Sequence, residues 1–513
     1  MRLLPKPILI SAFLLFAVLG AWSHFRFGYS HWDQSGHTFG SDDAFISYRY
    51  AWNLLNGHGL VFNPGERVEG YTNLLYTLLS AGLIWLNPDW VLYGCVGINV
   101  VAYVCTALTL YRYLGEITTP RRALLGLALM CINPIMWAWP ASGLEAPVVV
   151  LVQLGLFVTA ERLCRDDTLG RRINYGLLLL IACTLRADGF VFALIFNGVF
   201  LLRQRYRLFF VAVACTTLIT SAYFAARYAY YGDILPNTYY AKVTGTLTQR
   251  LGSAEEQMLN LFRQGAFFVY LIPIAWGFVQ LGNRLKTTRT VTWAAIPIIP
   301  ALSLTLVGYW FYVGGDVYFE RFLLILIPLT IIFVATHASK VGLWIFAAIY
   351  LALQIAPYKA DGRFRYHSSR YDRWVALGKH LKAHHPNSTL AIDAAGKAPY
   401  YSQLPTIDML GLNNQHIGHQ PASFGIVGHS KYDADYVLSQ KPDFIAAWGN
   451  QQLDMVWGLT RAKYLASGYE LRYVVNATAK SKKEDIVDVS GYSPERIATL
   501  HQQGYTYYVL GHH

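Results

Sequence analysis

Long apolar runs alternate with short polar loops along the chain up to about Pro357, and no comparable run follows. A helix needs about 20 mostly apolar residues to cross a bilayer, with a range of about 17–25. The shorter runs would have to tilt, thin the bilayer or pair as half-helices. The sequence therefore predicts a polytopic α-helical membrane protein with about eleven transmembrane helices, at residues 8–27, 91–111, 123–139, 146–161, 173–187, 189–202, 208–227, 263–282, 291–313, 322–336 and 341–357.

The loops between these runs indicate the direction in which the chain crosses. Cytoplasmic loops carry an excess of Lys and Arg, and placing all the basic loops in the cytoplasm requires about eleven crossings. The N-terminus is then cytoplasmic, the C-terminal part lies outside, and the further apolar run 71–86 lies at the outer interface or forms a re-entrant hairpin. The basic groups are Arg2/Lys6, Arg112/Arg121/Arg122, Arg162/Arg165/Arg171/Arg172, Arg203/Arg205/Arg207 and Arg284/Lys286/Arg289.

A different pattern begins after residue 360. Short apolar stretches of strand length alternate there with helical stretches such as 370–384, which is typical of a small α/β domain. We therefore expect a membrane domain over 1–360, with a first outer loop at 28–70, and a periplasmic α/β domain over 361–513. The expected strands lie near 389–393, 405–409, 443–448, 469–475 and 505–510.

Composition agrees with a membrane protein and excludes other classes. The chain is 54% hydrophobic and only 14% charged, whereas soluble proteins average about 45–50% apolar and about 25% charged residues. The net charge of +12 comes from basic residues in short loops, which argues against nucleic acid as a partner. The six cysteines lie within or beside apolar segments without CxxC spacing, so neither a zinc site nor a disulfide framework is indicated.

The predicted outer side collects the unusual polar residues of the chain. Five segments face outward in this topology: 28–70, 141–145, 186–189, 227–262 and 314–321. Ionisable groups at membrane depth are costly and usually line a functional cavity. We therefore expect a site on this face that draws on Asp42, Asp43, Glu66, Glu69, Glu145, Asp188, Asp316 and Arg321.

The first outer loop contains a predicted short helix over residues 41–57. Ser41 is a candidate N-cap, Asp42 and Asp43 occupy the first turn, and Asn56-Gly57 form a stop signal. The helix dipole should keep the two aspartates anionic at neutral pH. They are candidates for accepting a proton or holding a divalent cation, and ordinary capping is the alternative. An apolar stripe predicts that the helix lies along the membrane surface, through Phe45, Tyr48, Trp52 and Leu55.

The stretch from Asp42 to Asn73 resembles the first periplasmic loop of the GT-C glycosyltransferases. The resemblance is strongest to the AftB-type arabinofuranosyltransferases, which include mycobacterial arabinan and Gram-negative pilin arabinosyltransferases. In that superfamily an Asp-Asp or Asp-Glu pair beside a membrane-surface helix is the catalytic signature. Further elements resemble family motifs in order: Ser142-Gly143-Leu144-Glu145, Arg186-Ala187-Asp188-Gly189-Phe190, Leu235-Pro236-Asn237-Thr238-Tyr239-Tyr240-Ala241-Lys242, Gly314-Gly315-Asp316 with Arg321-Phe322, and the tail segments 390–393, 406–413 and 441–445.

The resemblance implies roles for these residues, with Asp42 and Asp43 as the catalytic pair. Arg and Lys neutralise phosphate charge, so the candidates for binding the donor phosphate are Lys242, Arg321 and Arg186. Snorkelling at helix ends is the alternative for these three, and Arg186 has the further option of pairing with Asp188. The candidates for shaping the acceptor cavity are Glu145, Asp188, Asn237, Tyr239, Asp316 and Glu69, the last of which, like Glu66, can also be read as an ordinary loop charge.

The expected activity is transfer of a sugar from a polyprenyl-phosphate donor on the outer face of a bacterial inner membrane. The resemblance implies arabinofuranose as the sugar, and a glycan, a lipid or a pilin-like protein as the acceptor. No metal site is assigned, because Mg²⁺ and Mn²⁺ usually take more oxygen ligands than one carboxylate pair offers, but a divalent cation stays open as a cofactor. The alternatives are a transporter or flippase, which lacks support because no hydropathy repeat is visible, and a non-enzymatic envelope assembly protein.

Overall fold

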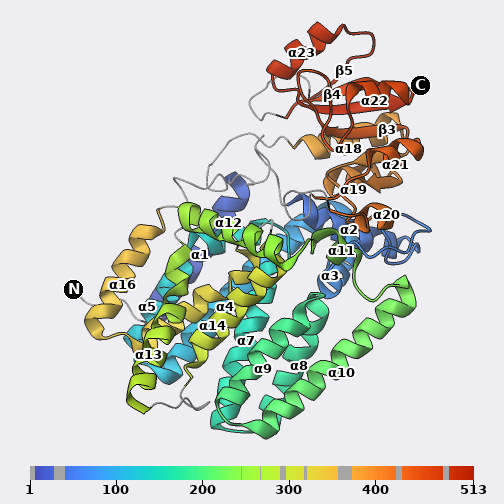
Figure 1. Ribbon diagram of the computed structural model, residues 1–513. Coiled ribbons are helices and arrows are strands. Elements are labelled where there is room, and N and C mark those ends of the chain that lie inside the picture. Colours follow the sequence, from blue (N-terminus) through green and yellow to red (C-terminus); the bar gives the residue numbers. More distant parts are fainter. Residues whose placement is uncertain are drawn as a thin grey trace.

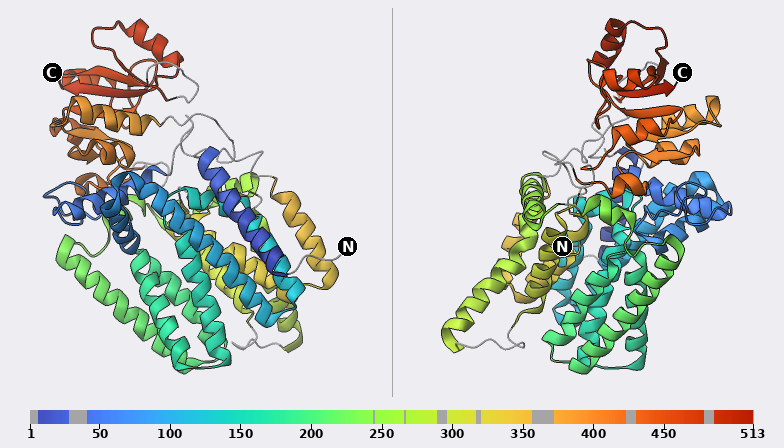
Figure 2. Two further views of the ribbon diagram at one scale, coloured as in Figure 1. Left: turned by 180° about the vertical axis from the view of Figure 1, so that it is seen from behind. Right: turned by 45° about the vertical axis from the view of Figure 1, so that its right-hand side comes forward.

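The computed structural model describes residues 6–27, 41–243, 245–265, 267–288, 296–316, 320–355, 372–422, 430–477 and 485–512. A bundle of helices is built from the first two thirds of the chain, and a sheet domain formed by the C-terminal part lies over one end of it (Figures 1 and 2). We call that end of the bundle the sheet-domain end.

Four single helices are long and apolar enough to cross a membrane, namely α1 (Lys6–Phe27), α4 (Val91–Ile117), α7 (Ala146–Arg165) and α10 (Tyr206–Tyr231). Two bent pairs raise this number to six by length and composition. Within the described residues every predicted run is helical, but several helices are short, so a count of eleven crossings is not established. The remaining helices of the bundle are α8 (Leu169–Leu185), α9 (Gly189–Leu202), α12 (Leu247–Gly265), α13 (Ile272–Thr288), α14 (Ile298–Val313), α15 (Leu326–His337) and α16 (Lys340–Leu353).

The predicted helix over 123–139 is in fact two, α5 (Pro120–Cys131) and α6 (Pro134–Ala141), bent by 51°. Proline has no backbone N–H and is favoured in the first helical turn. Asn133 caps the second helix, accepting a hydrogen bond from the Met136 amide at 3.1 Å. The sequence around Pro134 therefore starts a new helix where the apolar pattern alone suggests one continuous run.

The ambiguous run 71–86 forms α3 (Leu74–Leu86), which packs beneath α2 at the sheet-domain end (Figure 1). Its 13 residues span about 20 Å at about 1.5 Å per residue, short of the roughly 30 Å hydrocarbon core. The helix is therefore shorter than a straight crossing of an undeformed bilayer, and it exposes the large apolar side chains Leu78, Leu79, Trp85 and Leu86.

The C-terminal domain is a six-stranded mixed sheet in the order β2-β1-β3-β6-β4-β5. Parallel pairing joins the first three strands, and antiparallel pairing joins the rest. The five predicted strands are confirmed, whereas β5, a short edge strand with no fully buried residue, was missed. The strand bounds are β1 (Leu390–Ile392), β2 (Thr406–Asp408), β3 (Phe444–Trp448), β4 (Tyr469–Val475), β5 (Ile486–Asp488) and β6 (Tyr507–His512). Helix α18 (Arg373–His384) precedes the sheet, and α19 (Lys397–Ser402), α20 (Gln415–Gly418), α21 (Ala434–Ser439), α22 (Arg461–Ala466) and α23 (Pro494–Gln502) lie between its strands.

Helix α2 (Asp42–Leu55) lies at the junction of the two parts. Both of its faces are largely covered by protein, and its course along the membrane surface stays a prediction. Phe45 and Tyr48 pack into the core of the bundle, and Ile46 and Tyr50 pack in a second cluster that includes Ala395 of the sheet domain. The amphipathic pattern of the sequence predicts burial of the first face only. The second face also carries polar residues, and the sheet domain that covers it lies far along the chain.

Candidate active site

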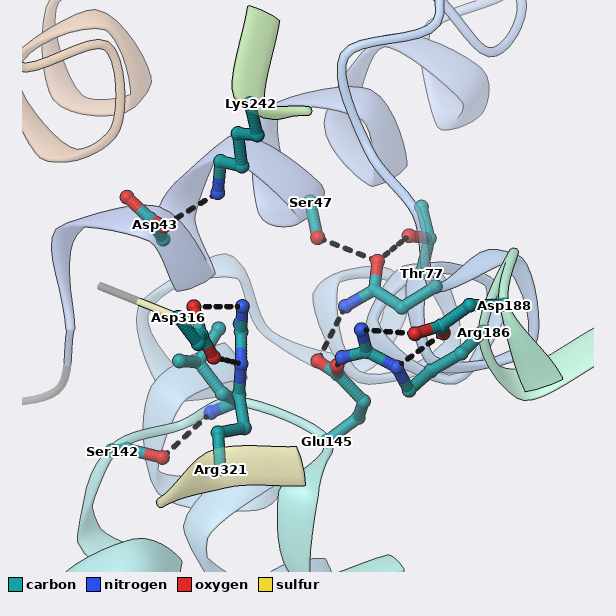
Figure 3. A network of polar contacts seen from close by, with 12 residues as sticks. Asp43, Ser47, Thr77, Ser142, Glu145, Arg186, Asp188, Lys242, Asp316 and Arg321 are labelled. Carbon is teal, nitrogen blue, oxygen red and sulfur yellow. Dashed lines mark hydrogen bonds and ion pairs between the residues drawn. The ribbon is translucent and has the colours of Figure 1, made fainter. Parts of the chain in front are cut away.

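A cavity of about 370 Å³ lies beneath the sheet domain, at the end of the bundle where the predicted outer loops converge. Its walls come from α2, the 70–73 segment, the turns at 144–145 and 186–188, the short helix α11 (Asn237–Lys242), the end of α14, and residues 315–316 and 321–322. Figure 3 shows how the polar residues of these segments face one another. The cavity also receives Leu412 from the sheet domain. Elements predicted separately along the sequence are thus brought together.

Asp43 and Lys242 face each other across this cavity (Figure 3). The Lys242 Nζ lies 3.8 Å from Asp43 Oδ2, and both side chains are partly exposed, at 25% and 29%. A contact of this length between half-buried groups is weak. Each group is therefore free to exchange its partner for a ligand.

Arg186 is held by two carboxylates instead. Its Nη1 lies 2.7 Å from Glu145 Oε1, its Nε donates to Asp188 Oδ1 at 2.8 Å, and its guanidinium lies over the Phe322 ring. The Tyr309 hydroxyl donates to the other oxygen of Asp188 at 3.2 Å. The alternative of a structural pair with Asp188 is therefore what the structure shows.

Arg321 is bound in the same way by Asp316, through contacts of 2.7 and 3.0 Å. Asp316 follows two glycines, of which Gly315 has a φ of +85° and lies so close to Gln257 of α12 that an added Cβ would be 2.3 Å from its Oε1. The same Gln257 oxygen accepts a hydrogen bond from the Asp316 amide at 2.7 Å. The turn thus needs glycine in order to place Asp316 against Arg321.

Asn73 is a member of the site that sequence reasoning missed. Its Oδ1 accepts hydrogen bonds from Ser47 Oγ at 2.8 Å and Thr77 Oγ1 at 3.1 Å, and its Nδ2 donates to Glu145 Oε2 at 2.9 Å. Because Ser47 lies one turn after Asp43 on α2, this amide connects the helix of Asp43 to the carboxylate that holds Arg186. A buried amide has no sequence pattern of its own, and the only signal is its place at the end of the motif-bearing loop.

Asp42 does not line the cavity. Its carboxylate accepts hydrogen bonds from the amides of Gly396 and Lys397 in the sheet domain, at 3.0 and 2.8 Å. Burial raises the pKa of Asp42 from 3.8 to about 7, against the lowering effect of the Lys397 amide and of the Lys397 charge. The expectation that this carboxyl is fully anionic at neutral pH is therefore wrong, because the covering domain removes it from water.

Two more predicted cavity residues lie outside the cavity lining. Glu69 forms a buried ion pair with Arg227 of α10, with contacts of 2.6–2.9 Å. The Asn237 side chain donates to main-chain oxygens of the sheet domain, among them that of Gly411 at 2.8 Å. Tyr239 does line the cavity, and Glu66 is an exposed loop residue that accepts from Asn63.

Comparison with known proteins agrees with this arrangement. The terminal β-(1→2)-arabinofuranosyltransferase of Mycobacterium tuberculosis is 28% identical over 337 residues, which cover 58% of this chain and 52% of that protein. The chain thus spans about half the length of this curated relative. Residues 360–508 match a family described as a domain of unknown function (DUF8728).

Solved structures extend the likeness over the whole chain. ArnT from Cupriavidus metallidurans bound to undecaprenyl phosphate has a TM-score of 0.57 at 10% identity, covering 99% of this chain and 98% of that one. The Archaeoglobus fulgidus oligosaccharyltransferase in complex with Zn and sulfate has a TM-score of 0.52 at 11% identity, over 90% and 72%. Mycobacterial arabinofuranosyltransferase AftD has a TM-score of 0.50 at 11% identity, over 99% and 42%. These proteins are GT-C glycosyltransferases. The chain has the GT-C fold.

Within this GT-C fold the charges of the cavity are nearly balanced. The described lining residues carry four carboxylates and three cations, a formal charge of −1. Arg186 and Arg321 are each held by carboxylate oxygens within 2.8 Å. Among the described lining residues, Lys242 is the cation with the weakest hold, so an incoming phosphate would meet it first.

The site does not present a cluster of metal ligands. Among the described residues, no three His, Cys, Asp or Glu side chains come together so that they could hold an ion. Asp42 and Asp43 point in different directions, the first to the sheet domain and the second to the cavity. The pair therefore does not fit a shared divalent cation, and no step below involves one.

Much of the remaining cavity wall is apolar. Phe190 and Val191 of α9, Phe224 of α10, and Tyr309 and Tyr312 of α14 line it together with Phe322 and Leu235. Helices α9, α10 and α14 are apolar helices of the membrane part. The polar groups thus stand beside a wall that suits hydrocarbon.

Proposed function

We propose that this protein transfers a sugar from a polyprenyl-phosphate donor to an acceptor hydroxyl, with Asp43 as the general base. The cavity joins a half-exposed carboxylate, a loosely held lysine and an apolar wall. These are the parts that a lipid-phosphate sugar and its acceptor require. The observation that carries the proposal is the placement of Asp43 opposite Lys242.

In the reaction, Asp43 takes the proton of the acceptor hydroxyl as its oxygen forms a bond to the anomeric carbon of the sugar. The bond between that carbon and the phosphate oxygen breaks, and polyprenyl phosphate leaves with the electron pair. The leaving group gains one negative charge, which the Lys242 ammonium neutralises. Cations and hydrogen-bond donors directed at a developing negative charge stabilise the transition state most strongly in a site that excludes water.

Arg186 and Arg321 support this site in a different way from that first expected. Each is already neutralised by carboxylates at short distance. They fix the wall next to Lys242 and contribute positive potential, while direct contact with the donor phosphate falls to Lys242. Asp188, Glu145 and Asp316 hold these arginines in place and thereby shape the cavity in which the sugar lies.

The relatives support the choice of lipid and sugar. The ArnT structure is described as bound to undecaprenyl phosphate, and the apolar wall on α9, α10 and α14 suits such a chain. The relative from Mycobacterium tuberculosis is an arabinofuranosyltransferase, which supports arabinofuranose as the sugar. Nucleotide sugars are absent outside the cytoplasm, so a lipid-linked donor agrees with a site on the outer face of a bacterial inner membrane, where a glycan, lipid or pilin-like protein supplies the hydroxyl.

The test is transfer by purified protein from a polyprenyl-phosphate arabinofuranose labelled in the sugar. The Asp43→Asn variant should lose about 10²–10⁴-fold in turnover, the usual worth of a positioned base, while it still binds the donor. Glu66→Gln, which neutralises an exposed carboxylate of the same loop, is the matched control and should keep its activity. Near-normal turnover in Asp43→Asn, or wild-type protein that releases no polyprenyl phosphate, would overturn the proposal.

A further inference from the structure

The sheet domain contacts the bundle through an extensive buried surface. Asn63 and Thr406 exchange two hydrogen bonds of 2.9 Å, one in each direction. Asn237 donates to the carbonyls of the turn at 411–414. Leu412 of that turn reaches the cavity. The domain is therefore a fixed wall of the site, and its family description assigns it no function.

Helix α2 holds α19 of this domain at both ends. Asp42 accepts from the amides of Gly396 and Lys397 where α19 begins. Arg49, two turns further along α2, donates to the carbonyls of Pro399 and Leu404 where α19 ends. A carboxylate at a helix N-terminus and a cation at its C-terminus each complement the helix dipole.

Arg49 is deeply buried, at only 1% exposed, and Asp42 is partly buried. Between them the Phe45 ring packs against Tyr400 and Tyr401 of α19, with centroids 5.4 and 5.7 Å apart. Asp42 and Arg49 lie seven residues apart and so share one face of α2. Asp43, one residue later, is turned by about 100° and faces the cavity.

The fit between the two helices leaves no room for an added atom. A Cβ at Gly396 would lie 1.9 Å from the Asp42 main-chain oxygen and 2.6 Å from its carbonyl carbon. A Cβ at Gly70, beside the cavity, would lie 1.8 Å from Asn413 Oδ1. Any movement of the sheet domain would therefore be transmitted directly to α2.

We infer that the C-terminal domain is the positioning element of the catalytic helix: α2 grips α19 through Asp42 and Arg49, and this grip directs Asp43 into the cavity. Asp42 and Arg49 are thus positioning residues. The inference rests on the proposed role of Asp43 as base. It differs from the family signature, in which both acidic residues of the pair count as catalytic.

Substitutions of Asp42 separate the two roles. The Asp42 carboxylate accepts one amide on each oxygen. Asparagine keeps one of these two acceptors and alanine keeps neither, so Asp42→Asn should keep turnover within about tenfold of wild type, and Asp42→Ala should lose much more. Hydrogen exchange of the Gly396 and Lys397 amides should be faster in Asp42→Ala than in Asp42→Asn. If Asp42→Asn is as inactive as Asp42→Ala while exchange in α19 stays at the wild-type rate, the inference is wrong.

A bulkier residue at Gly396 tests the same link while the charges of Asp42 and Arg49 are kept. This test also works if the Asp42→Ala protein fails to insert into the membrane. Gly396→Ala should speed amide exchange throughout α19 and lower turnover at least tenfold in a protein that still binds the donor. Gly82→Ala, on an exposed face of α3 with open space at its Cβ, is the control and should change neither. Faster exchange with unchanged turnover, or lost turnover with unchanged exchange, would overturn the inference. Exchange is measured without donor, so it remains informative even if the proposed reaction fails.

Discussion

The ion pair between Glu69 and Arg227 should be structural, and its loss should destabilise the protein asymmetrically. The two side chains are 2% and 4% exposed. The pair is joined by contacts of 2.6–2.9 Å. Removing one partner of a buried pair costs about 3–5 kcal/mol, because the remaining charge is left buried. The pair also helps to position α11, because the Glu69 carbonyl accepts a hydrogen bond from the main-chain amide of Asn237, the first residue of that helix.

The asymmetry follows from what each survivor can do. In Arg227→Met the remaining carboxyl can become neutral, since burial already raises the pKa of Glu69. In Glu69→Gln the guanidinium cannot lose its proton, although the amide oxygen retains one hydrogen bond. The free energy of unfolding should therefore fall by about 3 kcal/mol in Glu69→Gln. In Arg227→Met it should fall clearly less at about pH 6. The double variant Glu69→Leu/Arg227→Met should recover most of the loss, as apolar replacements of buried pairs usually do.

The assay is thermal unfolding in detergent, followed by tryptophan fluorescence. For a chain of this size a loss of about 3 kcal/mol corresponds to a fall of about 3 °C in apparent melting temperature. Transfer activity per folded molecule should change far less in Glu69→Gln than in Asp43→Asn. Wild-type melting of Glu69→Gln combined with lost transfer would refute this reasoning and return Glu69 to the acceptor cavity. A double variant as unstable as Glu69→Gln would also contradict it.

Three further predictions concern the site and its covering domain. Burial raises the pKa of Asp42 from 3.8 to about 7, so between these pH values the docked state binds a proton that the undocked state does not. Docking of the sheet domain should therefore weaken as pH rises from 4 to 7, by up to about 4 kcal/mol, and change little at higher pH. Hydrogen exchange of the α19 amides should show this pH dependence in wild type but not in Asp42→Asn. Asn73→Leu leaves the buried carboxylate of Glu145 without one donor and should lower turnover about tenfold while donor affinity, measured by equilibrium binding, is kept; unchanged turnover would remove Asn73 from the site. Lys242→Met should weaken donor binding more than Arg321→Met does, and the reverse order in the same titration would reassign the phosphate contact.

The apolar pattern predicted most helices of the bundle, because a bilayer imposes a long run of apolar residues on every helix that crosses it. It missed the break before Pro134 and the amphipathic helix α12, which has no such run. The strands of the sheet domain were also predictable, because alternation and flanking turns are local. The neighbours of α2 could not be predicted in this way, because Ile46 and Tyr50 pack in one cluster with Ala395, which lies far along the chain. For the same reason the sequence treats Asp42 and Asp43 as equivalent, whereas a rotation of about 100° sends one to each side of the junction.

Site prediction failed where the partner of a residue is distant and ordinary. Glu69 is adjacent to the motif-bearing loop, but its role depends on Arg227, more than one hundred residues later in α10. Asn73 shows no periodicity and no charge, yet it connects three segments of the site. For Arg186 the alternatives were a contact with the donor phosphate and an ion pair with Asp188, which is only two residues away. The structure contains that local ion pair.

The junction at α2 has a consequence for how the protein is made. The hydrogen bonds between Asp42 and the amides of Gly396 and Lys397 join residues 354 and 355 positions apart. At about 5–20 residues per second, the ribosome needs roughly 20–70 s to synthesise the intervening chain. Throughout that time α2 has emerged without its partner α19. The junction that places Asp42 and Asp43 can thus form only after the bundle helices α3 to α16 have been synthesised.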